Sequence, residues 1–274
     1  MHHHGKHGGE EFRKLAEENT IIRCLVGSGL HGTSVGGHDD RDEMGVCIEP
    51  PEYVIGLKEF EQYEHHTAWE REGGLRNRSG PGDLDVNIYS LRKFIRLALK
   101  GNPSILCLFF VPEASTTYIS GYGYDLQNMA GAVVSLEAGT AFIGYLHAQR
   151  RSMLSHEGKG RDVTRPELIE KYGWDTKFGG HMLRLGYQGC ELLETGRITL
   201  PMPERERDAV MACRTGDMSM EDCLSEAECL EDSLKRLMET STLQEHPDRE
   251  AVNRWLIEMY QEWWDWGPLA RRVS

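Results

Sequence analysis

The stretch that decides the fold is Ile21-Ile22-Arg23-Cys24-Leu25-Val26-Gly27-Ser28, in which six mostly apolar residues precede a glycine and a serine. A short apolar run that stops at a glycine predicts a buried β-strand, and an amphipathic helix is expected before it at 10–19. Glycine brings no side chain, so backbone amides and the Ser28 hydroxyl can approach the oxygens of a phosphate. A helix that begins just after the turn would favour an anion further. The sequence therefore predicts a strand that ends in an anion-binding turn, with a glycine-rich loop over 29–37.

Further strands are expected at 44–49, within 58–67 and at 83–89. The last of these alternates between polar and aliphatic residues, and its polar side carries Asp83, Asp85, Asn87 and Tyr89. Ser90 is a suitable N-cap for a helix at 91–100, which Gly101 ends.

The second half of the chain is helical in pattern. Helices are expected at 136–154, 165–172, 176–195, 203–214, 220–240 and 247–264. The expected fold class is therefore α+β, with a small mixed β-sheet domain at 10–120 followed by an α-helical domain at 121–274. We expect the two to meet near residues 112–125.

The composition fits a globular protein of 274 residues with a formal net charge of -13. Such a charge argues against a protein that coats long nucleic acid, although a small acceptor such as a tRNA end is compatible with it. No apolar run reaches the ~20 residues that span a bilayer, and no signal peptide is evident, so no membrane partner is expected. Seven cysteines without a Cys-x-x-Cys pair predict reduced thiols and a cytoplasmic location.

Three carboxylates are the candidate metal ligands. Asp40 and Asp42 lie two positions apart, so on a strand both project to the same side, where they repel each other unless a cation lies between them. Hard oxygen ligands suit Mg²⁺. Asp85 would add a third carboxylate from a separate strand, and Asp83 is its rival for that position. Taken alone, Asp-x-Asp is more typical of a polar turn in an acidic protein, and it is the preceding Gly27-Ser28 and the separate Asp85 that favour a metal site.

A basic stripe is expected on the helix at 176–195. Lys177, His181, Arg184 and Gln188 recur at i, i+4, i+7 and i+11, so they share one face. A lysine and an arginine on that face could neutralise the charge of a nucleoside triphosphate. An ordinary solvated helix face is the alternative interpretation.

The order of these motifs resembles the DNA polymerase beta nucleotidyltransferase superfamily. The resemblance rests on Gly27-Ser28, on Asp40-x-Asp42 leading into Gly45-Val46, and on Asp85 in the stretch 85–94. Within the superfamily, the chain is most similar to the predicted nucleotidyltransferases associated with RNA-repair operons and also carried by phages. Residues 100–103, 109–112 and 172–177, followed by His181, Arg184 and Leu185, fit that subgroup, and the resemblance covers roughly residues 20–240. Gly29 and His31 depart from it, because many relatives have a basic residue and a tyrosine there.

The resemblance implies a polymerase-beta palm-like catalytic domain, a helical domain that binds nucleotide and acceptor, and a mechanism with two Mg²⁺ ions, or Mn²⁺ in their place. Asp40 and Asp42 would hold the ion that bridges the nucleotide phosphates, and Asp85 would join them around a second ion near the acceptor hydroxyl. Gly27, Ser28, Lys177, His181 and Arg184 would bind the nucleotide, which can be ATP. Pyrophosphate would leave.

The acceptor stays open at the level of sequence. An RNA 3′ end or a tRNA end is favoured by the RNA-repair association, and a protein or a small molecule by the acidic surface. Two other functions are compatible with the motifs: a toxin-like modifier of tRNA or protein, and a noncatalytic nucleotide-sensing module on the same fold. The sequence does not indicate the preferred base or the oligomeric state.

Overall fold

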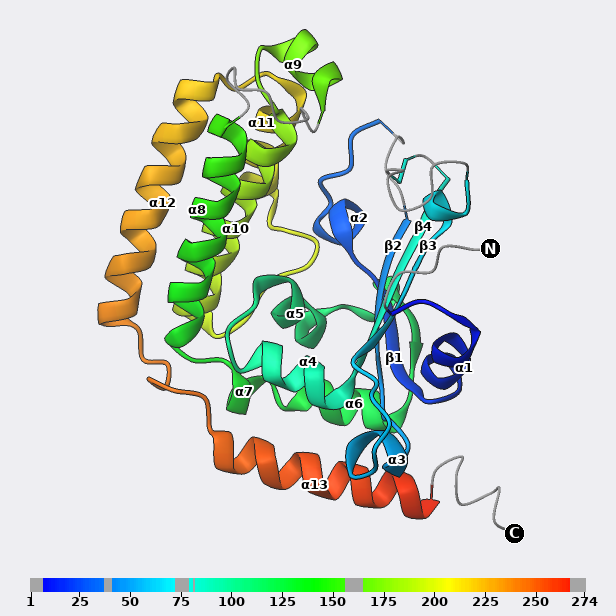
Figure 1. Cartoon of the computed structure of the whole chain (residues 1–274). Helices are drawn as coiled ribbons and strands as arrows, with labels where there is room; N and C mark the ends of the chain where they lie inside the picture. The colour runs from blue at the N-terminus through cyan, green and yellow to red at the C-terminus, as the bar shows by residue number, and fades with distance from the viewer. Residues whose placement is uncertain (1–6, 37–40, 72–78, 81, 156–164, 267–274) are drawn as a thin grey trace.

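The computed structural model describes residues 7–36, 41–71, 79–80, 82–155 and 165–266. These residues form one five-stranded sheet with helices on both faces and a helical layer beside it (Figure 1). The predicted α+β class is confirmed. The predicted site residue Asp40 lies outside the described residues. The division into domains at residue 120 stays a prediction.

The sheet has the strand order β3-β4-β2-β1-β5. Its strands are β1 (Thr20–Leu25), β2 (Arg41–Cys47), β3 (Gln62–His66), β4 (Leu84–Ser90) and β5 (Thr116–Ile119). β2 and β4 run parallel, and the other neighbours are antiparallel. β2 begins three residues earlier than predicted, so Asp42 lies inside the strand. β5 is not predicted because its four residues are too few to show an alternating pattern.

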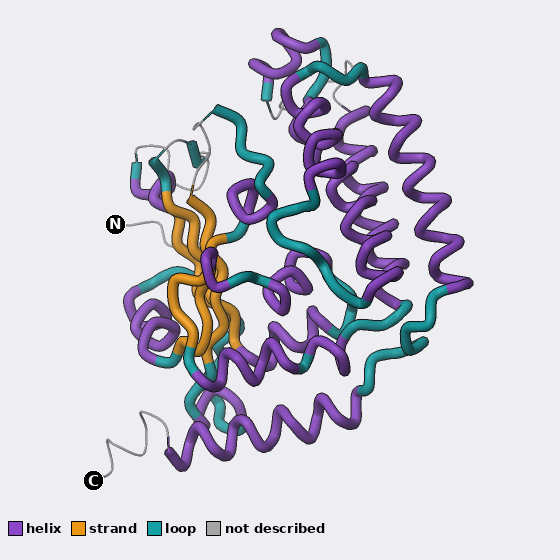
Figure 2. Tube along the Cα trace, turned by 180° about the vertical axis from the view of Figure 1, so that it is seen from behind, coloured by secondary structure: helices purple, strands orange, loops and turns teal. Residues whose placement is uncertain are grey.

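The two faces of the sheet pack against different helices (Figure 2). α1 (Glu10–Glu18) covers one face, where it meets the aliphatic side of β4 at Val86 and Ile88. The opposite face packs on α4 (Leu91–Ala98), α5 (Pro103–Cys107) and α6 (Gly121–Asn128). Side chains alternate along a strand, so the polar side of β4, with Asp85 and Asn87, points away from α1.

The helical layer consists of α8 (Glu137–Ser155), α10 (Thr176–Thr195), α11 (Glu204–Thr215) and α12 (Met220–Thr240). α10 packs against the other three, and its glycines permit a close approach: a side chain at Gly186 would meet Leu230 of α12, and one at Gly189 would meet Phe142 of α8. α10 is therefore the centre of this layer, which lies beside the sheet (Figure 1). The remaining short elements are α2 (Gly27–His31), α3 (Pro51–Val54), η1 (Thr67–Glu70), η3 (Leu108–Phe110), η4 (Glu113–Ser115), α7 (Ala130–Val133) and α9 (Pro166–Tyr172).

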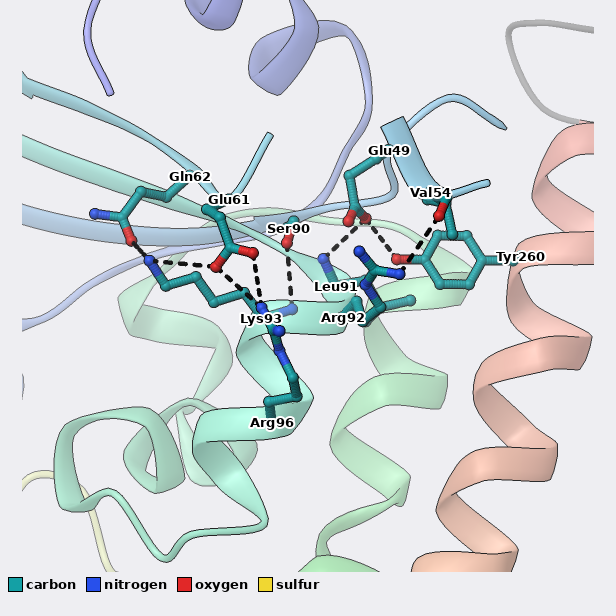
Figure 3. A network of polar contacts seen from close by, with 10 residues as sticks. All are labelled: Glu49, Val54, Glu61, Gln62, Ser90, Leu91, Arg92, Lys93, Arg96 and Tyr260. Atoms are coloured by element: carbon teal, nitrogen blue, oxygen red, sulfur yellow. Dashed lines mark hydrogen bonds and ion pairs between the residues drawn. The ribbon is translucent and has the colours of Figure 1, made fainter. Parts of the chain in front are cut away.

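Hydrogen bonds to Glu49, which is 1% exposed, hold the last helix, α13 (Arg249–Trp266), against the sheet. The Glu49 carboxylate accepts hydrogen bonds from the Tyr260 hydroxyl at 2.6 Å and from the backbone N–H of Leu91 at 3.2 Å (Figure 3). Trp264 donates to the Glu49 carbonyl. Glu49 therefore joins α13 and the N-terminus of α4 to the end of β2. Burial raises the pKa of its carboxyl group.

The predicted helix boundaries hold to within a few residues. The helices at 176–195 and 220–240 are confirmed to the residue. Ser90 and Ser219 cap their helices through their side chains, and Gly196 ends α10 in the left-handed conformation. The last helix begins at Arg249 rather than Pro247, with Asp248 accepting a hydrogen bond from the Ala251 N–H. Within the described ranges no single helix is long and apolar enough to cross a membrane; one pair, 121–133 with 137–154, reaches that length only with a 96° bend.

Candidate active site

A cavity of about 360 Å³ lies where one end of the sheet meets α2, α5, α10 and α11. It brings together seven of the eight predicted site residues: Gly27, Ser28, Asp42, Asp85, Lys177, His181 and Arg184. These residues come from positions as far apart as 27 and 184, so the fold gathers motifs that the sequence only places in order. The eighth, Asp40, falls in the gap between residues 36 and 41 that the structure leaves undescribed.

The backbone of Gly27 lies in close contact with the side chain of Asp42. Its φ of +67° lies in the left-handed region that only glycine adopts freely. A Cβ atom at this position would also collide with Oδ2 of Asp42. The backbone carbonyl of Asp42 accepts a hydrogen bond from Val26 at 2.9 Å, which holds the two strand ends together. The Gly27-Ser28 turn and the Asp42 carboxylate therefore pack directly against each other.

Asp42 and Asp85 are direct partners in the parallel β2–β4 register, so their side chains lie on the same face. Oδ1 of Asp85 accepts from the Ser79 hydroxyl at 2.6 Å and lies 2.9 Å from Nδ1 of His66, the register partner of Asp85 on β3. Both contacts use Oδ1, and no described residue forms a hydrogen bond or an ion pair with Oδ2.

Asp83, the alternative candidate to Asp85, forms hydrogen bonds within the neighbouring loop. Its carboxylate accepts hydrogen bonds from the backbone N–H of Gly80, the Thr67 hydroxyl and the Arg71 guanidinium. These contacts hold the pKa of Asp83 below its usual value, with the Gly80 bond the largest cause. Asp83 does not line the cavity, whereas Asp85 does.

The donor set fits a hard divalent cation as far as it is described. Asp42 and Asp85 place carboxylates on adjacent strands at the edge of the cavity, and oxygen ligands of this kind suit Mg²⁺. Among the described residues no group of three or more His, Cys, Asp or Glu side chains is arranged to hold a metal ion. The predicted set of three includes Asp40, which lies outside the described residues.

Opposite the carboxylates, α10 and α11 supply positive charge. Lys177 and His181 are exposed to the cavity, and Arg184 is buried at its inner end with 6% exposure. A third cation is Arg214 of α11, whose side chain passes over Gly180 and donates to the carbonyl of Thr33. His181 is not a cation, because burial and the neighbouring charges of Arg184 and Lys177 lower the pKa of its imidazole well below the ordinary value. The predicted basic stripe thus faces the cavity, and it does not form an outer surface of the helical layer.

The sequence pattern misses several residues that line the cavity, among them His31, His66, Asn87 and Arg214. His31 stands out in the sequence only as a departure from related motifs. Arg214 ends a different helix from the basic stripe, and no periodicity connects helices that pack together in space. Asn87 carries a detectable signal, since it shares the polar side of β4 with Asp85.

With this geometry in place, the comparisons with known proteins identify the family. The RNA repair pathway DNA polymerase beta family, RlaP, matches residues 1–258. The chain belongs to this family. Membership in RlaP makes it a nucleotidyltransferase of the DNA polymerase beta type, which takes a nucleotide as substrate and transfers a nucleoside monophosphate.

A solved structure that aligns with this RlaP chain is a nucleotidyltransferase-like protein from Exiguobacterium sibiricum 255-15. The two share 13% sequence identity, and the alignment covers 91% of this chain and 77% of the other, with a TM-score of 0.29. A score this low carries no argument about the site. Comparison with curated proteins finds no significant match.

Proposed function

We propose that the chain transfers a nucleoside monophosphate from a nucleoside triphosphate to the 3′ hydroxyl of an RNA, in a reaction that needs Mg²⁺ or Mn²⁺. The observation that carries this proposal is one cavity that joins the Asp42–Asp85 pair to the side chains of Lys177, Arg184 and Arg214. Paired carboxylates facing a cationic wall suit a substrate with both metal-bound and free phosphate oxygens.

The triphosphate binds between the Gly27–Ser28 turn and the cationic wall. Gly27 allows close approach of the backbone, and the Ser28 hydroxyl adds a donor at the same place. Lys177, Arg184 and His181 then contact the phosphates from the opposite side. Charge-assisted hydrogen bonds of this kind hold the leaving pyrophosphate in line with the α-phosphorus.

The metal would be held by Asp42 and Asp85, together with Asp40. When bound, it supplies charge neutralisation at the phosphates and lowers the pKa of the attacking hydroxyl. Asp85 orients that hydroxyl and is placed to receive its proton. The new bond joins the acceptor oxygen to the α-phosphorus, the bond to the bridging oxygen breaks, and pyrophosphate leaves with its electron pair.

The acceptor approaches from the β3 side of Asp85. The strand order places β3 on the far side of β4 from β2, so His66 flanks Asp85 on the side away from Asp42. The His66 ring lies against the ring of Trp69 of η1, with the centroids 3.8 Å apart and the planes tilted by 32°. An aromatic pair next to the proton acceptor suits a nucleoside at the end of an RNA, because bases stack on such rings.

A labelled-transfer survey tests this proposal. The full chain is incubated with each α-phosphate-labelled triphosphate, with Mg²⁺ or Mn²⁺, and separately with RNA, protein and small hydroxyl acceptors. Label is expected in RNA. Label in protein would replace the proposed acceptor by a protein side chain, and label in no acceptor, with any base and either metal, would contradict the proposed transfer.

A further inference from the structure

Arg184 is a buried arginine with no acidic partner among the residues that the structure describes. No carboxylate oxygen of the described residues lies within 4.0 Å of its guanidinium, although Asp42 and Glu43 line the same cavity. The nearby Cys107 is no counterion either, because burial raises the pKa of its thiol to about 11. An uncompensated buried charge is costly, so its retention at a cavity wall indicates that an anion completes the site.

Two side chains hold this guanidinium in place. Nη1 of Arg184 donates to Oε1 of Gln188 at 2.8 Å and lies 3.1 Å from Nε2 of His31. Nε2 of Gln188 lies 3.0 Å from Nδ1 of His31 and so closes a triangle. Both other members are buried, at 6% exposure for His31 and 2% for Gln188. The triangle fixes Arg184 between α2 and α10.

The triangle contains one donor too many. A guanidinium only donates, so Nε2 of His31 and the amide oxygen of Gln188 must both accept from it. A neutral imidazole has a single acceptor, so Nδ1 carries the proton and faces the amide nitrogen, which is another donor. Turning the amide by 180° satisfies Nδ1 but sets the amide nitrogen against Arg184. In every neutral arrangement one contact joins two donors.

Protonation of His31 would add a further donor, and the site opposes it. Burial lowers the pKa of His31 well below its ordinary value, and the positive charge of Arg184 lowers it further. His31 therefore acts as a neutral acceptor toward Arg184. What the triangle lacks is a negatively charged acceptor on its cavity side.

We propose that His31 and Gln188 are positioning residues, which hold Arg184 as a preformed clamp for an oxyanion of the substrate's polyphosphate. His31 belongs to α2, which contains the Gly-Ser turn, and it acts through Arg184 rather than on the phosphate. An incoming phosphate oxygen supplies that negatively charged acceptor, because it accepts from guanidinium N–H groups while Nε2 of His31 continues to hold Arg184 in place. The inference rests on the proposed function only for the identity of the anion.

The test uses binding of inorganic tripolyphosphate and orthophosphate to the full chain, measured by calorimetry without any acceptor. His31→Phe removes the acceptor that holds Arg184, and we expect tripolyphosphate affinity to fall about ten- to a hundredfold. His31→Gln keeps an acceptor oxygen at the end of its side chain and is expected to restore most of the loss. His147→Gln is the matched control, because His147 pairs with Glu231 between α8 and α12, outside the cavity.

A purely structural role for His31 would lower thermal stability in both His31 variants and leave the affinity of the folded fraction unchanged. That result, or equal affinities of wild type and His31→Phe, would overturn the clamp. The two proposals fail separately. If tripolyphosphate binding depends on His31 but no nucleotide is transferred, the clamp stands and the proposed function falls. Transfer whose Michaelis constant for nucleotide is unchanged by His31→Phe refutes the clamp alone.

Discussion

Gly27 and Asp42 occupy adjoining space, so that any side chain at Gly27 would overlap the Oδ2 atom of Asp42. Gly27 follows β1 as the first residue of α2, and Asp42 lies near the start of β2, where the Val26–Asp42 backbone hydrogen bond joins the two segments. The close approach explains why glycine precedes serine in the turn, and it leads to the first prediction.

Gly27→Ala should have two effects, a loss of stability and a displacement of the Asp42 carboxylate. An alanine at φ +67° costs about 1–2 kcal/mol of stability, and its methyl group displaces the Asp42 carboxylate. We expect a modest drop in melting temperature and a loss of transfer activity much larger than that drop explains. Gly29→Ala is the control, since nothing lies within 4 Å of a Cβ at that position. Equal activity of the two variants would show that the contact is unimportant.

Asp42→Asn and Asp85→Asn should each lower the turnover rate by at least about 100-fold, because the neutral amide neither holds the metal nor stabilises developing charge. Circular dichroism should show folded proteins. Asp83→Asn is the matched control, since Asp83 binds Thr67, Gly80 and Arg71 outside the cavity. If Asp83→Asn lost activity and Asp85→Asn kept it, the assignment of the second carboxylate would have to be reversed.

Lys177→Ala should weaken nucleotide binding about tenfold, by removing one charge-assisted hydrogen bond to the phosphates. The Michaelis constant for the triphosphate is expected to rise more than the turnover rate falls. The control is Lys171→Ala, because Lys171 lies over the Tyr172 ring and does not line the cavity. Unchanged nucleotide affinity in Lys177→Ala would show that Lys177 does not contact the phosphates and that this part of α10 is an ordinary solvated surface.

Glu49 should make stability depend on pH. Burial is the largest cause of its raised pKa, so the folded state binds the Glu49 proton more tightly than the unfolded state does. The stabilising effect of that proton is present below the unfolded pKa and is lost as pH rises through the folded pKa. The free energy of unfolding of Glu49→Gln, measured by urea denaturation, should therefore lack this part of the decline between acid and neutral pH. Identical pH profiles for the two proteins would contradict the assignment.

Local patterns predict the fold well where the elements are long or strongly alternating. The two faces of β4 can be predicted from its strict alternation, the end of α10 from Gly196, and the start of α12 from Ser219. β5 is too short to be predicted from the sequence pattern, and its place beside β1 depends on pairing across more than 90 residues. Short strands of this kind are specified by tertiary contacts rather than by their own residues.

The candidate site likewise contains residues that sequence motifs predict and residues that only the packed structure brings together. Gly27, Ser28, Asp42 and Asp85 belong to motifs with recognisable spacing, and the cavity joins them as expected. The triangle of His31, Arg184 and Gln188 joins α2 to α10 across more than 150 positions. Its members have no common spacing, so only the packed structure shows that they meet. Arg214 is likewise brought to the cavity by the packing of α11 on α10.

The most direct test of the proposed function is transfer of α-phosphate label from a nucleoside triphosphate to RNA whose 3′ end is either a free hydroxyl or blocked. We predict label in the free-hydroxyl RNA with Mg²⁺ and wild-type chain, and none with the blocked RNA or with Asp42→Asn. Equal labelling of both RNAs, or labelling that survives Asp42→Asn, would contradict transfer to a 3′ hydroxyl at this site.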